Sequence, residues 1–80
     1  MRIDKFLKNS RIIKRRSIAK EACESGRVFI NGRKAKPGSE VNVEDEIFIQ
    51  FGKSELKVKV LETKENARKE EAETMYEIMC

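Results

Sequence analysis

The spacing of apolar residues changes along this 80-residue chain from a helical period to an alternating one, and this change limits the possible folds. Ile3, Phe6 and Leu7 lie at i, i+3 and i+4, which predicts a short amphipathic helix at the start of the chain. A second helix is predicted over Arg16 to Ser25, and Gly26 is placed to end it in the left-handed conformation. The apolar side of this second helix comprises Ile18, Ala19, Ala22 and Cys23.

From Arg27 onward the apolar period is two, which predicts strands. A strand over Arg27 to Ile30 leads into Asn31-Gly32, a pair that favours a type I′ hairpin because both central positions of that turn need a positive φ. Arg33 to Lys36 should then return antiparallel. After a turn at Pro37-Gly38-Ser39, the further alternating residues are Val41 and Val43, then Ile47, Ile49 and Phe51, and finally Leu56, Val58 and Val60.

The tail from Asn66 to Cys80 returns to helical spacing, with Ala72, Met75, Tyr76 and Met79 on one side and Asn66 as a candidate N-cap. The expected fold class is therefore α+β: two N-terminal helices, a small antiparallel sheet and a C-terminal helix over about 66–80. We expect one domain over residues 1–80, with its core within about 1–61.

Size and composition favour binding over catalysis. A chain of this length buries only about 60 to 70% of its unfolded surface, which leaves a thin core and little room for a catalytic cleft. Charged residues make up 40% of the chain and histidine is absent, so the usual general base near neutral pH and the commonest ligand of catalytic metals are missing. We therefore expect no enzymatic activity and no cofactor.

Cys23 and Cys80 are far apart in the sequence and form no CxxC pair, so two free thiols in a reducing cytosol are the simplest interpretation, and no metal site is expected. The charged amino terminus lacks the apolar run of a signal peptide, and no apolar stretch approaches the roughly 18 residues that span a bilayer. These features predict a soluble, cytoplasmic protein with no membrane partner.

The net charge of +4 is distributed unevenly. Residues 1–36 contain twelve lysines and arginines against three acids, or +9, whereas residues 37–80 contain six against eleven, or −5. Such an asymmetry is typical of a protein with a polyanion-binding face, although an unevenly charged, solvated surface is the alternative.

The densest cationic feature is Lys14-Arg15-Arg16 at the predicted start of the second helix, with Lys20 one turn further along. Free backbone N–H groups at a helix start favour a phosphate, and guanidinium groups add bidentate contacts to its oxygens. The candidate RNA-binding residues are Arg2, Lys5, Lys14, Arg15, Arg16, Lys20, Arg33 and Lys34, with Lys36 as a further extension. Asp4, an acid among these cations, is expected either to brace Arg2 or Arg16 or to balance Lys8 at i+4.

The aromatic residues do not suggest a base-stacking surface. Phe6, Phe29 and Phe51 fall in core-facing registers, and only Phe48 is out of register with its apolar neighbours. We therefore expect recognition of the backbone and shape of structured RNA. A helix-turn-helix DNA-binding protein fits less well because the connector between the helices is long, and a protein-interaction adaptor that docks through the acidic tail stays open.

Several of these segments together resemble the S4 RNA-binding domain, also called the alpha-L motif. The resemblance rests on Arg15-Arg16-Ser17-Ile18-Ala19-Lys20, on Glu24 to Gly32, and on the opening Met1 to Leu7, and it covers roughly Met1 to Phe51. At Glu44-Asp45 many members of the family have Gly-Asp, so the turn there is the one departure from the pattern.

Free-standing domains of this type that act in bacterial ribosome-associated quality control are the most similar, together with related heat-shock proteins that bind separated large subunits. The resemblance implies binding to a large ribosomal subunit that carries peptidyl-tRNA, with contacts to ribosomal RNA and tRNA. It further implies assistance to C-terminal alanine tailing of the stalled chain, with the tailing elongation factor as a further partner. A ribosome-assembly or general ribosomal-RNA-binding factor is the alternative.

Overall fold

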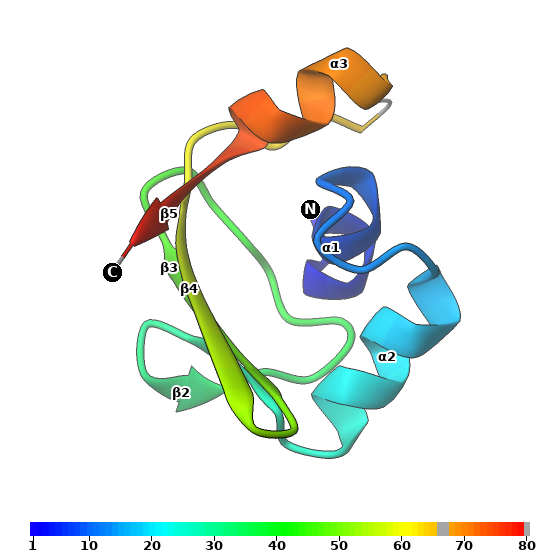
Figure 1. Ribbon diagram of the computed structural model, residues 1–80, viewed down its shortest axis with the longest axis vertical. Helices are drawn as coiled ribbons and strands as arrows, with labels where there is room; N and C mark the ends of the chain where they lie inside the picture. Colours follow the sequence, from blue (N-terminus) through cyan, green and yellow to red (C-terminus); the bar gives the residue numbers. More distant parts are fainter. Residues whose placement is uncertain (66–67, 80) are drawn as a thin grey trace.

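Five antiparallel strands form one sheet in the order β2-β1-β3-β4-β5, and the first two helices pack against one of its faces (Figure 1). The computed structural model describes residues 1–65 and 68–79. Its elements are α1 (Ile3–Asn9), α2 (Arg16–Glu24), β1 (Val28–Ile30), β2 (Arg33–Lys34), β3 (Glu46–Phe51), β4 (Ser54–Val60), α3 (Lys69–Ala72), the 3₁₀ turn η1 (Glu73–Met75) and β5 (Tyr76–Met79). The α+β class predicted from the sequence is confirmed.

The two N-terminal helices form where the apolar spacing predicts them. The apolar side of α1 is fully buried against the inner face of the sheet through Ile3, Phe6 and Leu7. The corresponding buried residues of α2 are Ala19 and Cys23. Gly26 has a φ of 76° and ends α2, as expected for a residue that must adopt the left-handed conformation. Ile18 was predicted to lie on the apolar side of α2, but its side chain is 49% exposed because the helix buries only a narrow stripe.

The hairpin between β1 and β2 has the predicted turn. Asn31 and Gly32 have φ values of 51° and 84°, the two positive values that a type I′ turn needs. The Asn31 side chain also ties the turn to β3, since its Oδ1 accepts from the Glu46 backbone N–H at 2.9 Å and its Nδ2 donates to Asp45 at 3.1 Å. β2 extends only over Arg33–Lys34, shorter than predicted.

The turn before β3 forms although Glu44 stands where glycine is common in the resembled family. Glu44 has a φ of 81°, a conformation that costs a non-glycine residue about 1–2 kcal/mol. Its backbone N–H donates to the Val60 carbonyl at 2.8 Å, and its carboxylate pairs with Lys59 at 2.9 Å. These contacts hold the turn in place.

The tail differs from the long helix predicted over about 66–80. Within the described part of the tail, 68–79, the α-helical residues are Lys69–Ala72; a 3₁₀ turn follows, and Tyr76–Met79 forms β5, which pairs with β4 through Val58↔Ile78 and Val60↔Tyr76. The helical spacing is correct for Ala72 and Met75, which are both buried. Beyond Met75, pairing with the free edge of β4 satisfies the backbone and overrides that spacing. The proposed N-cap at Asn66 lies outside the described residues.

The core lies between the helices and the inner sheet face, and includes Val28, Ile47, Ile49, Val58 and Val60 as predicted. Two core predictions for aromatic residues are wrong. Phe51 is 40% exposed because β3 extends past the helices, and Phe29 is only half-buried because it points to the outer face of the sheet. No helix among the described residues is long and apolar enough to cross a membrane.

Candidate nucleic-acid interface

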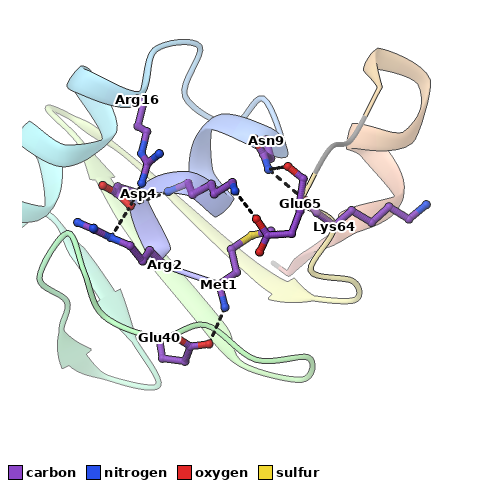
Figure 2. A network of polar contacts seen from close by, with 9 residues as sticks. Met1, Arg2, Asp4, Asn9, Arg16, Glu40, Lys64 and Glu65 are labelled. Atoms are coloured by element: carbon purple, nitrogen blue, oxygen red, sulfur yellow. Dashed lines mark hydrogen bonds and ion pairs between the residues drawn. The ribbon is translucent and has the colours of Figure 1, made fainter.

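A buried carboxylate holds two arginines together on one side of the helix pair. Asp4, in the first turn of α1, is 2% exposed, and its Oδ1 lies 3.5 Å from Arg2 Nε and 3.5 Å from Arg16 Nη2 (Figure 2). Both guanidinium groups remain about half exposed. Asp4 therefore braces both arginines, and each still presents donors to solvent.

Arg2 is fixed from its backbone as well. It forms an isolated antiparallel bridge with Glu40, while the flanking Met1 carbonyl and Ile3 N–H bond to Val41 and Ser39 at 2.8 Å. The Arg2 guanidinium lies against Gly38, where an added Cβ would be 3.7 Å from Nη2. The loop after β2 thus supports one wall of the arginine pair.

Arg16 is the first residue of α2, so it lies beside the free N–H groups of that helix start. Arg15 is the N-cap and makes no side-chain capping bond, and no acid lies in the first turn. Lys14, Arg15 and Lys20 are exposed, and the described residues give none of them an ion-pair partner. Backbone donors and unpaired cations at one helix start form a site suited to a phosphate.

Lys5 is held by a residue that no sequence pattern pointed to. Its ammonium pairs with Glu65, 60 positions away, and this contact holds the pKa of the Glu65 carboxyl below its usual range. Asn9 of α1 adds two hydrogen bonds from Nδ2, to the carbonyls of Lys64 at 3.0 Å and Glu65 at 2.8 Å. The segment after β4 is therefore fastened to α1, as Figure 2 shows.

The hairpin cations lie apart from the arginine pair. Lys34 Nζ is close to Gly26, at the C-terminal end of α2, whereas Arg16 is at its start. Nine helical residues separate these ends by about 13 Å. The structure brings Arg2, Lys5 and Arg16 together but leaves Arg33 and Lys34 at a second location.

A second cationic cluster was not predicted as a unit. Lys8, Arg11, Lys14 and Lys69 surround an open cavity of about 470 Å³, together with Asn9. Lys69 joins the others because α3 folds back beside the end of α1 (Figure 1). The sequence shows the basic residues of the first 14 positions but not the approach of Lys69 from the tail.

Cys23 lies in the core beneath this face. Burial, with smaller contributions from Asp4 and Glu24, raises the pKa of its thiol to about 11, so the group is neutral near pH 7. A neutral, buried thiol is a packing residue. Cys80 lies outside the described residues.

Comparisons with known proteins agree with this geometry. Residues 1–47 match the family model of the S4 domain. The chain is 54% identical over 78 residues to the RQC P-site tRNA stabilizing factor of Halalkalibacterium halodurans, covering 98% of this chain and 89% of that one. It is 52% identical over 79 residues to the factor of the same name from Streptococcus pneumoniae, covering 99% and 90%.

A solved structure agrees as well. The trimeric structure of Vibrio cholerae heat shock protein 15 superposes with a TM-score of 0.91 at 31% identity, covering 99% of this chain and 81% of that one. The family model spans more than half of the chain, and the stabilizing factors match it over nearly their whole length. The chain belongs to the S4 domain family, in the same group as these RQC P-site tRNA stabilizing factors.

Proposed function

We propose that this chain binds the large ribosomal subunit while a tRNA occupies the P site, and that it acts there in ribosome-associated quality control. The observation that carries the proposal is the pair of half-exposed arginines, Arg2 and Arg16, held by the buried Asp4 at the start of α2. The names of the two stabilizing factors, which share more than half of their aligned residues with this chain, support the same role.

The pair acts as a preformed phosphate clamp. Because Asp4 fixes both guanidinium groups before RNA arrives, binding loses less side-chain entropy than it would with free arginines. The backbone N–H groups at the start of α2 add donors directed at the same phosphate. Lys14, Arg15 and Lys20 provide further cations along one path, and Lys5 adds a fourth when RNA competes with Glu65 for its ammonium.

The second cationic cluster, Lys8, Arg11, Lys14 and Lys69, widens this face. This second group of cations supplies contacts for a second strand or a second RNA molecule, as simultaneous binding of ribosomal RNA and tRNA requires. Binding to the tRNA-loaded subunit, and less to the empty one, stabilises the loaded state by mass action. The protein works by binding in the cytoplasm, and it assists alanine tailing of the stalled chain by a partner elongation factor.

Sedimentation of a tagged copy from cells tests the proposal. We expect co-migration with free large subunits that carry tRNA, and loss of co-migration in the Arg16→Ala variant. The matched control is Lys53→Ala, which removes an exposed cation from the turn between β3 and β4, away from the clamp. Co-migration with immature particles that lack tRNA would instead indicate a ribosome-assembly factor and would refute the quality-control role.

A further inference from the structure

The outer face of the sheet, opposite α1 and α2, carries a row of side chains that the clamp does not use. The strand register places Lys34, Phe29, Phe48, Lys57 and Met79 side by side, one from each of the five strands in sheet order. Phe29 and Phe48 are half-buried, and neither is part of the core cluster. Two aromatic rings thus lie open to solvent at the centre of the row.

These rings form the floor of a hollow. Their centroids are 5.8 Å apart and their planes are inclined at 57°, so the pair leaves a cleft instead of a flat stack. The hollow has a volume of about 560 Å³ and is closed on one side by the Asn31-Gly32 turn. This volume lies within the range of small-molecule and base-sized binding sites.

A carboxylate and an ammonium lie together at the rim of the hollow. Glu46 Oε1 is 3.4 Å from Lys57 Nζ, both line the hollow, and each side chain is nearly half exposed. The two carboxylate oxygens of Glu46 are hydrogen-bond acceptors, and the Lys57 ammonium beside them is a donor. The pairing edge of guanine offers the reverse order, two N–H donors next to the O6 acceptor, whereas adenine has only one N–H donor group there.

We propose that this hollow binds an unpaired guanine base of RNA. The base stacks on Phe48 and Phe29, Glu46 accepts from N1–H and N2–H, and Lys57 donates to O6. Lys34, in the same row as the two rings, is exposed, and the described residues give it no ion pair, so it neutralises an adjoining phosphate. This charge arrangement favours RNA over an apolar peptide, which would leave the Lys34 ammonium without a partner and would not use the polar rim of Glu46 and Lys57.

The assignment also gives Lys34 a role, which its distance from Arg16 excludes in the clamp. The two RNA sites would then lie on opposite faces of the sheet, with structured RNA on the helix side and one extruded base on the other. This inference goes beyond the quality-control role and does not depend on it.

Amide chemical shifts of the labelled wild-type protein, titrated with the pentaribonucleotides UUGUU and UUAUU, test the inference. We expect UUGUU to shift amides of β1, β3 and β4 around the hollow and to bind several-fold more tightly than UUAUU. Loss of one base–aromatic stack weakens binding by about 5- to 160-fold, so Phe48→Leu should lose at least about 5-fold. Phe51→Leu, on the same strand but outside the hollow, is the matched control and should bind like wild type.

Glu46→Gln replaces the acceptor pair by one acceptor and one donor, and should reduce the preference for UUGUU while the remaining amide spectrum stays unchanged. Arg16→Ala should leave binding in the hollow within about twofold, which separates this site from the clamp. Shifts confined to α1 and α2 would overturn the proposal. Equal binding of both RNAs would also overturn it, as would guanosine monophosphate binding as tightly as the pentamer. Shifts around the hollow with an apolar dipeptide but with neither RNA would assign it to a protein partner.

Discussion

Replacing Asp4 by asparagine tests whether Asp4 positions Arg2 and Arg16 for RNA or acts only through its negative charge. Asp4 is 2% exposed and contacts Arg2 and Arg16 at 3.5 Å each, while both guanidinium groups stay about half in water. The asparagine keeps the shape and can still accept the Lys5 backbone N–H that Asp4 accepts at 2.8 Å. Only the two charged contacts and the favourable charge in the first turn of α1 are lost.

The stability loss follows from the exposure of the partners. Half-solvated ion pairs contribute about 0.2–1 kcal/mol each, and a carboxylate in the first helical turn about 0.3–1 kcal/mol. Asp4→Asn should therefore lower the free energy of unfolding by about 1–2 kcal/mol. For a domain of this size, each kcal/mol lowers Tm by about 4–8 °C, which differential scanning calorimetry can measure.

The sign of the effect on RNA affinity is the decisive result. Removing a negative charge next to a phosphate site should tighten binding if Asp4 acts only by its charge. Releasing two ordered arginines should weaken binding instead, because fixing each one costs about 0.5–1.5 kcal/mol, which together amounts to about 5- to 160-fold. We expect the weakening, measured by fluorescence anisotropy with labelled protein and purified large subunits at one salt concentration.

Glu24→Gln is the matched control, since it makes the same charge change on the exposed side of α2 and the described residues give Glu24 no ion pair. It should leave affinity unchanged or raise it slightly. If Asp4→Asn binds as tightly as wild type or more tightly, Asp4 is no brace and the preformed clamp is refuted.

Three further predictions concern the tail, the core thiol and pH. Met75→Ala should destabilise the protein by about 2–5 kcal/mol in urea unfolding, because Met75 is fully buried; a loss below about 1 kcal/mol would mean that the tail is not packed into the core. In a Cys80→Ser background, Cys23 of the folded protein should react with Ellman's reagent at pH 8 far more slowly than Cys23 of the urea-unfolded protein, because burial raises the pKa of its thiol to about 11. Equal reaction rates in the two states would contradict this burial. The folded pKa of Glu65 is lowered by Lys5, so the stabilisation from this contact is complete above the ordinary glutamate pKa and disappears as pH falls through the lowered folded pKa. Carbon-detected NMR titration should show this lowered pKa, and Lys5→Met should return it to its usual range; an unchanged value would exclude the contact.

Local signals made most of the N-terminal half predictable. Gly26 and the Asn31-Gly32 turn need left-handed backbone, and the residue types at these positions indicate it directly. The tail was harder because Tyr76–Met79 is an edge strand with its two central residues exposed, so it shows no alternation. Only the open edge of β4, which is distant in the sequence, makes this segment a strand.

The candidate site was predictable in its cations but not in their grouping. The sequence identified Arg2, Arg16 and Asp4 between them, because Arg2 directly precedes the first helix and Arg16 begins the second. It did not show that Glu65 would return to Lys5, or that Lys69 would complete a cluster with Lys8, since these contacts depend on the path of the chain after β4. Phe29 was misjudged because alternation alone does not say which face of a sheet the helices cover, whereas Phe48 lies out of register with Ile47 and Ile49 as predicted.

The salt dependence of binding to tRNA-loaded large subunits tests the phosphate clamp most directly. If four to six phosphates are neutralised, log affinity should fall against log salt concentration with a slope of about −3 to −5. Arg16→Ala should weaken binding and make the slope shallower by about 1 while Tm falls only slightly. A wild-type slope near zero, or an Arg16→Ala slope equal to that of wild type, would contradict a clamp built on Arg2, Asp4 and Arg16.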